Sequence, residues 1–239
     1  MDKEDILNLQ SSFEQKNAEE ILEWACTRFS EPEFAQSSGL GLEGQVLTDM
    51  LLKINPKATI FTLDTGRLNP ETYDLMDQTM DRYHFTYDIL FPDTAQVEHM
   101  VKEHGINLFY KSMDHRKKCC YIRKICPLKR KLSTLKLWIC GLRKTQSVTR
   151  HEIKKLEWDD TNGLIKINPL ADWSTEEVWD YIRAHGVPYN QLHDNGYPSI
   201  GCAPCTRPVQ PYEDIRAGRW WWEPPDKKEC GIHGHKENR

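Results

Sequence analysis

The sequence lacks several features that would assign a protein to a broad class at once. No stretch approaches 18 consecutive apolar residues, the length that a membrane-spanning helix requires. The opening segment, MDKEDILNLQSSFEQKNAEE, is polar and acidic and contains no secretory signal. A basic excess is also missing, because the formal net charge is −4, and this argues against general nucleic-acid binding. We therefore expect a cytoplasmic protein with no membrane and no nucleic-acid partner.

Repeats and a standard phosphate loop are absent too. The sequence shows no self-similarity at solenoid periods and no G-x-x-x-x-G-K-S/T motif, so ordinary P-loop chemistry is not supported. A length of 239 residues suits one large domain, or one domain with a tail. The final stretch, EPPDKKECGIHGHKENR, combines prolines, glycines and many charges. We expect one domain over residues 1–222 and a mobile C-terminal tail over residues 223–239.

Strand and helix patterns alternate along the first 140 residues. Strands are predicted at 33–38, within 57–63, at 85–90 and at 137–141, and helices at 17–29, 45–54, within 64–76 and at 94–104. This alternation predicts an α/β fold with a doubly wound, mostly parallel sheet covered by helices on both faces. Ligands of such sheets bind beyond the carboxyl ends of the strands. After residue 150 the pattern loosens, and only a helix capped by Ser174 or Asp172, with Glu177 following, is predicted.

Two adjacent thiols, Cys119 and Cys120, lie in a segment that carries ten Lys or Arg residues against one acid over residues 111–136. A disulfide between them is disfavoured, since neighbouring Cα atoms are about 3.8 Å apart and a relaxed disulfide spans roughly 4.4–6.8 Å. A single zinc ion is awkward, because adjacent side chains diverge whereas zinc ligands are usually two to four residues apart. An inert buried pair stays open at this point.

A second pair, Cys202 and Cys205, forms a C-A-P-C motif that suits a redox pair, half a zinc site or half an iron–sulfur site. A 4Fe–4S cluster takes four thiolates, one on each iron, and so tolerates adjacent ligands. The four thiols therefore favour such a cluster over zinc. Nearby cations would offset its negative charge, and Lys124 would lie one turn from Cys120 if that cysteine opens a helix.

Several loops carry groups that suit an anion. The loop SSGLGLEG offers hydroxyl and backbone N–H groups before a helix N-terminus. Arginine forks bind phosphate or sulfate, and loop positions hold Arg67, Arg143, Arg150, Arg216 and Arg219. In the tail, Cys230 stands near His233 and two lysines, which favours a reactive thiolate over an idle cysteine. We assign Cys26, Cys126 and Cys140 to packing.

The combined motifs resemble one known family. K-K-C-C-x-x-R-K, G-C-x-P-C-T, S-S-G-x-G-x-E-x-Q-V-L-T-D-M, F-T-L-D-T-G-R-L, G-L-R-x-x-Q-S-x-T-R and E-C-G-I-H together resemble the iron–sulfur type of assimilatory adenylyl-sulfate reductase within the phosphoadenylyl-sulfate reductase family. The resemblance runs from about residue 33 to residue 234. It implies a fold of the adenine nucleotide α-hydrolase type with a modified pyrophosphate loop. Where the family loop often reads S-F-G-A-E, this chain has Ser38-Gly39-Leu40-Gly41-Leu42-Glu43.

The resemblance also implies roles for individual residues. Cys119, Cys120, Cys202 and Cys205 would hold one 4Fe–4S cluster, and Cys230 would be the catalytic nucleophile. Lys124 would couple the cluster to the substrate. The substrate-binding set would be Ser37, Ser38, Gly39, Leu63, Thr65, Gly66, Arg67, Lys124, Arg143, Arg150, Arg216, Arg219 and His233.

The implied reaction is reduction of adenosine 5′-phosphosulfate to sulfite and AMP, in assimilatory sulfate reduction and cysteine biosynthesis. A Cys230 thiolate attacks the sulfate sulfur, AMP leaves, and a thioredoxin- or glutaredoxin-type dithiol releases sulfite from the S-sulfocysteine. Alternatives are reduction of the 3′-phosphorylated nucleotide, alone or in addition, a zinc-stabilised adenine-nucleotide-binding module, and an ATP-dependent ligase of the same broad fold. The oligomeric state is left open, with a homo-oligomer among the options.

Overall fold

The computed structural model describes residues 1–146 and 152–224. The chain divides into two compact units. The first, here called the sheet unit, comprises Met1–Thr62, Thr72–Asp88 and Leu132–Asn190. The second, here called the thiol unit, comprises Leu63–Glu71, Ile89–Lys131 and Gln191–Arg239. The undescribed residues 147–151 fall within the range of the sheet unit, and the undescribed residues 225–239 fall within the range of the thiol unit. The predicted domain boundary after residue 222 stays a prediction, and most of the predicted tail lies outside the described residues.

Regular elements follow one another in the described ranges. The α-helices are α1 (Lys3–Phe13), α2 (Ala18–Arg28), α3 (Leu42–Ile54), α4 (Pro70–Tyr83), α5 (Thr94–His104), α6 (Met113–Cys120), α7 (Cys126–Leu132) and α8 (Thr175–His185). The strands are β1 (Phe34–Ser37), β2 (Ile60–Leu63), β3 (Asp88–Leu90), β4 (Leu137–Ile139), β5 (Leu156–Asp159) and β6 (Leu164–Ile167). A π-helical segment, Tyr121–Ile125, joins α6 to α7. No helix of the described ranges is long and apolar enough to cross a membrane.

The sheet has six strands in the order β3-β2-β1-β4-β6-β5. Strand β1 pairs in parallel with β2 and β4, and β4 pairs in parallel with β6, whereas β5 is an antiparallel edge strand beside β6. The central strands are short and buried on both faces, as apolar runs such as Leu137–Ile139 require. The predicted mostly parallel α/β fold is confirmed.

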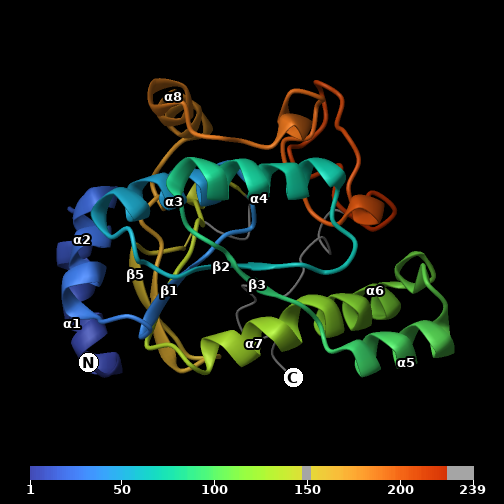
Figure 1. The fold of residues 1–239 in the computed structure, drawn as a ribbon, viewed down its shortest axis with the longest axis horizontal. Helices are drawn as coiled ribbons and strands as arrows, with labels where there is room; N and C mark the ends of the chain where they lie inside the picture. The colour runs from blue at the N-terminus through green and yellow to red at the C-terminus, as the bar shows by residue number, and fades with distance from the viewer. Residues whose placement is uncertain (147–151, 225–239) are drawn as a thin grey trace. The chain divides into compact units, whose positions relative to one another are not determined.

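Helices α3, α4 and α8 lie on one side of the sheet, and α1 packs against β5 (Figure 1). Helix α3 is buried along most of its length because it packs against both α2 and α8. Helix α8 begins at Ser174, whose side chain accepts a hydrogen bond from the Glu177 amide at 3.1 Å. The Glu177 carboxylate in turn accepts one from the Ser174 amide at 2.7 Å. The predicted cap at Ser174 is therefore confirmed.

The region after residue 150 is more regular than the sequence indicated. It contains the β5–β6 hairpin, with Leu156 opposite Ile167. The pattern was obscured because β6 buries a lysine, Lys166, whose ammonium pairs with Glu157 at 2.9 Å and lies 5.5 Å from the ring centre of Trp138. A charge at a core position breaks the apolar run by which a buried strand is recognised.

A buried carboxylate links three helices of the sheet unit. Asp49 on α3 accepts hydrogen bonds from Lys53 Nζ (2.6 Å), Tyr181 Oη (2.6 Å) and Tyr83 Oη (2.8 Å). Burial alone would raise the pKa of this carboxyl, but the three donors outweigh burial and hold its pKa below the ordinary value. A group with a depressed folded pKa stabilises the protein above its unfolded pKa, and that stabilisation is lost as the pH falls through the folded pKa.

We expect Asp49→Asn to lower the free energy of unfolding at pH 7 by about 2 kcal/mol, because hydrogen bonds to a charged acceptor are replaced by weaker ones. The variant should also lose less stability than the wild type between about pH 4 and lower pH. Urea unfolding at a series of pH values measures both effects. Asp180→Asn, at an exposed i,i+3 pair with Arg183, is the control and should change stability by less than about 0.5 kcal/mol. Equal acid sensitivity of Asp49→Asn and wild type would contradict this reading.

Candidate functional site

The first thiol pair closes a helix rather than opening one. Helix α6 begins after Ser112, whose hydroxyl accepts a hydrogen bond from the His115 amide at 3.2 Å, and it ends at Cys120. Cys120 therefore ends a helix and does not open one. The backbone continues as the π-helical segment, so Lys124 still follows Cys120 by about one helical turn. A π-helical turn is common at functional sites because it shifts the side chains that follow it.

The second thiol pair flanks a single 3₁₀ turn, Ala203–Cys205. The Cys205 amide donates to the Cys202 carbonyl at 2.9 Å, and the Thr206 hydroxyl donates to the same carbonyl at 3.0 Å. The Ala203 amide donates to the Arg67 carbonyl at 2.8 Å. The C-A-P-C loop is thus fixed at both its ends, and its two thiols are held by backbone geometry.

The four thiols of the two pairs lie in one neighbourhood of the thiol unit. Burial raises the pKa of Cys205 to about 12, and the next contributions come from Cys202 and Cys120, with a smaller one from Cys119. Cys205 belongs to an apolar cluster with Met100, Leu108, Phe109 and Trp220, against which Cys119 and Cys202 also pack. All seven cysteines of the described ranges are unbridged. The sequence-predicted convergence of the two pairs therefore agrees with the thiol-unit geometry.

Cations surround these thiols. Burial raises the pKa of Cys202, but Lys124, a hydrogen bond with Thr65 and the charge of Arg219 outweigh burial, so that its pKa lies below the ordinary value. Burial likewise raises the pKa of Cys119, and Arg123 opposes this effect without reversing it. The positive charge therefore outweighs burial at Cys202, whereas burial prevails at Cys119 and Cys205.

The donor set fits a 4Fe–4S cluster. Four thiols in one apolar, cation-lined place match the one-thiolate-per-iron requirement of a cubane. No group of His, Cys, Asp or Glu side chains in residues 1–146 and 152–224 is arranged to enclose one metal ion. A cubane needs a wider arrangement, because its ligands bind separate irons. In addition, the buried indole N–H of Trp220 has no hydrogen-bond partner within the described chain, and cluster sulfurs are acceptors for such a donor.

The loop predicted to face adenosine is attached to the thiol pairs. Thr65 Oγ1 lies 3.2 Å from Cys202 Sγ, and its carbonyl accepts a hydrogen bond of 2.6 Å from Arg123 Nη1. Gly66 has a φ of +69°, which favours glycine, and its amide donates to Asp64 Oδ1 at 2.7 Å. Residues 63–67 thus form one tight turn directly beside the second cysteine pair.

The side chain of Arg67 contacts the segment around Asn107. Its guanidinium donates to the Ile106 carbonyl at 3.2 Å and to Asn107 Oδ1 at 2.9 Å, and it lies 5.4 Å from the ring centre of Phe109. These contacts anchor the turn to the segment before the thiol-bearing helix. Contact between Arg67 and an anion stays a prediction.

The predicted nucleotide loop of the sheet unit follows β1. The Ser37 hydroxyl accepts a hydrogen bond of 2.7 Å from the Trp138 indole, and the Ser38 amide donates to the Phe61 carbonyl at 2.8 Å. After Gly39, the chain reaches Gly41, the N-cap of α3, with no side chain capping the helix. The first amides of α3 are therefore not satisfied by a cap, as an anion-binding helix N-terminus requires.

Arg143 is held by the sheet unit itself. Its guanidinium donates to Glu43 Oε1 (2.8 Å), Thr145 Oγ1 (2.7 Å), the Trp173 carbonyl (3.0 Å) and Thr175 Oγ1 (3.1 Å). Its side chain is 4% exposed. These bonds fix the loop after β4 to the start of α3 and of α8, so the structure gives Arg143 a positioning role, and its predicted grip on the substrate stays a prediction.

The remaining predicted residues divide by location. Arg219 stacks on Trp220 at 4.8 Å and donates to the Ile200 carbonyl at 3.1 Å, beside the second cysteine pair. Arg216 is partly exposed in the same segment. Arg150, Cys230 and His233 lie outside the described residues. Sequence reasoning missed the buried ion pair of Arg116 and Glu223 in the thiol unit, because its partners are 107 residues apart.

The fold and the thiols together indicate the class of protein. A mostly parallel sheet with a glycine-containing β1–α3 loop is typical of nucleotide-binding α/β proteins. The chain also shares its fold with an FMN adenylyltransferase of Candida glabrata, in complex with FAD and inorganic pyrophosphate, at a TM-score of 0.56 and 16% identity, covering 98% of this chain and 84% of the other. We conclude that the chain is an α/β protein with a mostly parallel sheet that carries two cysteine pairs.

The chain belongs to the phosphoadenosine phosphosulfate reductase domain family, whose profile matches residues 33–208. An adenosine 5′-phosphosulfate reductase of Allochromatium vinosum is 50% identical over 214 residues, which cover 90% of this chain and 83% of the relative. One from Pseudomonas aeruginosa strain LESB58 is 46% identical over 235 residues, covering 96% and 86%. The crystal structure of a phosphoadenylyl-sulfate reductase from Candida auris, a phosphate complex, matches with a TM-score of 0.75 and 31% identity, covering 87% and 98%. The family predicted from the motifs is confirmed.

Proposed function

We propose that the protein is an oxidoreductase that reduces adenosine 5′-phosphosulfate to sulfite and AMP in assimilatory sulfate reduction. The observation that carries this conclusion is the 50% identity, over nine-tenths of the chain, with an adenosine 5′-phosphosulfate reductase. The cations around the two cysteine pairs agree with it, because a sulfonucleotide is an anion.

The first chemical step belongs to Cys230. Its thiolate attacks the sulfate sulfur, a sulfur–sulfur bond forms, and the bond from that sulfur to the bridging phosphate oxygen breaks. AMP leaves with the electron pair of the broken bond, and an S-sulfocysteine stays on the enzyme. Negative charge grows on the departing phosphate, and preorganised cations such as Lys124 and the loop arginines stabilise it.

The second step needs two electrons from outside the chain. A dithiol of the thioredoxin or glutaredoxin type supplies them: one thiolate attacks Cys230 Sγ, and sulfite leaves with the electrons of the sulfur–sulfur bond. The second thiol of the partner then attacks the mixed disulfide and regenerates the Cys230 thiolate. The partner ends as a disulfide, which balances the reduction of sulfate-level sulfur to sulfite.

Cys119, Cys120, Cys202 and Cys205 would hold the 4Fe–4S cluster. When bound, the cluster supplies a fixed anionic centre that orders the basic segment and tunes the field near the sulfate, rather than a source of electrons. The chain's own residues then do the positioning. Lys124 carries positive charge from the thiol pairs toward the substrate, and Thr65 joins the nucleotide turn to Cys202.

Substrate choice between the two sulfonucleotides is the first test. The Candida auris structure, a phosphoadenylyl-sulfate reductase, makes the 3′-phosphorylated nucleotide the second candidate. We expect kcat/KM for adenosine 5′-phosphosulfate to exceed that for the 3′-phosphorylated form by at least about tenfold, since a site built without a partner for the extra phosphate leaves it unpaired. Sulfite release with reduced thioredoxin measures both. Equal or reversed kcat/KM values would replace the first substrate by the second.

A further inference from the structure

We propose that the buried Arg116–Glu223 ion pair positions Cys230 for attack, by fixing the start of the C-terminal segment to the helix that bears the first thiol pair. The inference rests on the proposed role of Cys230 as acceptor of the sulfonyl group. It assigns a positioning function to two residues outside the thiol and substrate sets, and the pair itself touches neither the substrate nor the reacting sulfur.

The contact is a bidentate fork. Arg116 Nε donates to Glu223 Oε1 at 3.0 Å, and Arg116 Nη2 donates to Glu223 Oε2 at 2.7 Å. The side chains are 1% and 4% exposed. The guanidinium also stacks on the Trp220 ring, 4.7 Å from its centre. Such a fork fixes direction as well as distance, because two parallel hydrogen bonds define the plane of both groups.

Arg116 connects this fork to the first thiol pair. Arg116 and Cys120 are four residues apart on α6 and so share one face of the helix. Arg116 precedes Cys120 by about one turn, so the ion pair is attached to the helix that ends with the first thiol pair. The Glu223 carboxylate is therefore attached, through Arg116, to the helix that bears Cys119 and Cys120.

Backbone contacts connect the same segment to the second thiol pair. The Trp220 amide donates to the Cys205 carbonyl at 3.1 Å, and the Arg207 amide donates to the Gly218 carbonyl at 3.0 Å. Thr206 and Arg219 form an isolated antiparallel bridge. Residues 218–223 are thus fixed to one cysteine pair through the backbone and to the other through the ion pair.

A buried ion pair at this place is not explained by stability alone. Taking two charges out of water costs free energy that their attraction only partly returns, and apolar replacements of similar size are often equally stable. The best-supported role of buried ion pairs is to select one conformation of the chain over others. Here the arrangement selected is the position of residues 218–223, from which the sequence continues to Cys230.

The fixed position of Glu223 limits how far the Cys230 thiol can lie from it. Cys230 follows Glu223 by seven residues, and a fully extended chain of that length spans at most about 25 Å. A thiol tethered within that radius has an effective concentration in the millimolar range or above at any point it reaches. Releasing Glu223 lengthens the tether by the residues that detach with it and lowers that concentration.

The test is the rate at which anaerobically purified full-length chain, mixed with adenosine 5′-phosphosulfate without reductant, acquires a sulfonate on Cys230, followed by quenching and peptide mass spectrometry. Glu223→Gln keeps the shape but removes the charge. We expect its adduct rate to fall about two- to threefold, because effective concentration falls roughly as the −3/2 power of a tether that grows from seven to about 13 residues, while iron and sulfide content and the Kd for AMP equal those of wild type. A structural role alone would lower all of these together.

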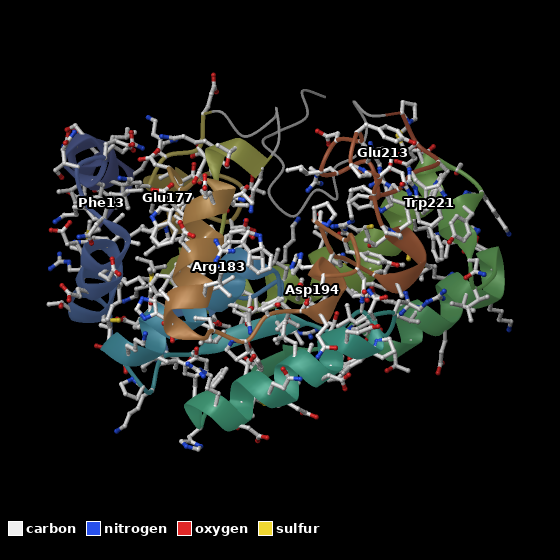
Figure 2. The ribbon with its side chains drawn as sticks, turned by 90° about the horizontal axis from the view of Figure 1, so that it is seen from above. Phe13, Glu177, Arg183, Asp194, Glu213 and Trp221 are labelled. Carbon is white, nitrogen blue, oxygen red and sulfur yellow. The ribbon has the colours of Figure 1, made fainter. Side chains whose placement is uncertain are left out.

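A matched control exists in the same unit. Arg207 and Glu213 also form a bidentate fork, at 2.8 and 2.6 Å, but their side chains are 34% and 22% exposed. Figure 2 labels Glu213, and also Trp221, which precedes Glu223 by two residues. Glu213→Gln makes the same chemical change, and we expect its adduct rate to equal that of wild type.

A second variant keeps the proposal testable if Glu223→Gln does not fold. The double variant Arg116→Met/Glu223→Leu replaces the charges by apolar groups, and we expect normal iron and sulfide content with a slow adduct rate. A wild-type adduct rate in that double variant, or in a folded Glu223→Gln, would overturn the inference. Failure of the wild-type chain to form any adduct would instead refute the proposed function.

Discussion

Cys230→Ser should abolish sulfite release from adenosine 5′-phosphosulfate, with a rate at least about a thousandfold below that of wild type. Serine keeps the size of the side chain but is a far weaker nucleophile at neutral pH, so the sulfur–sulfur bond does not form. Binding of AMP should be unchanged, because the residues proposed to hold the nucleotide are untouched. Sulfite release with reduced thioredoxin measures the first quantity, and isothermal titration calorimetry with AMP measures the second.

Cys26→Ser is the control for this result. Cys26 is half-buried in α2 of the sheet unit, and burial raises the pKa of its thiol to about 11, so that it is protonated at neutral pH. We expect full activity from this variant. Sulfite release by Cys230→Ser at a rate near wild type would show that another group accepts the sulfonyl, and the proposed mechanism would then be wrong.

Cys202→Ser should remove the iron–sulfur cluster and lower sulfite release by at least about a hundredfold. A cubane that loses one thiolate ligand loses the bond that holds one of its irons. Without the cluster, the three remaining thiols and the cations around them have no shared partner, and the contact of Thr65 with the Cys202 thiol is lost as well. Iron and acid-labile sulfide analysis of anaerobically purified protein should give about four of each per wild-type chain and far less for the variant.

The variant Cys126→Ser tests whether a cysteine close in sequence to the first thiol pair is also a cluster ligand. Cys126 begins α7, six residues after Cys120, but it is not part of the predicted ligand set. We expect this variant to keep its iron, its sulfide and its activity. One zinc and no sulfide in wild type would favour the zinc-stabilised alternative, and iron loss in Cys126→Ser would show that the ligand set was assigned incorrectly.

The parallel part of the sheet could be predicted because its strands are short apolar runs followed by turns and helical spacing. Phe34–Ser37 and Leu137–Ile139 have this form, and they pair as neighbours. The β5–β6 hairpin could not be predicted, since Lys166 interrupts β6 and its burial is offset only by Glu157, nine residues earlier. The burial of Lys166 depends on its ion pair with Glu157, and no local sequence pattern links these two residues.

The thiols could be predicted because cysteine is rare and its spacing is informative, even though Cys120 and Cys202 are 82 positions apart. The use of each arginine could not. A loop arginine looks the same in sequence whether it faces an anion or a carboxylate of its own chain. Arg143 donates to Glu43, 100 residues away, and Arg116 donates to Glu223, 107 residues away. Only the tertiary structure decides between these two uses.

The most direct test of the whole account is the location of the sulfonyl group after a single turnover. Wild-type chain mixed with adenosine 5′-phosphosulfate in the absence of reductant should release AMP and gain the mass of one SO₃ group, on the peptide that contains Cys230. Adding reduced thioredoxin should remove that mass and release an equal amount of sulfite. AMP release with no added mass, or a sulfonate on any other cysteine, would contradict the account.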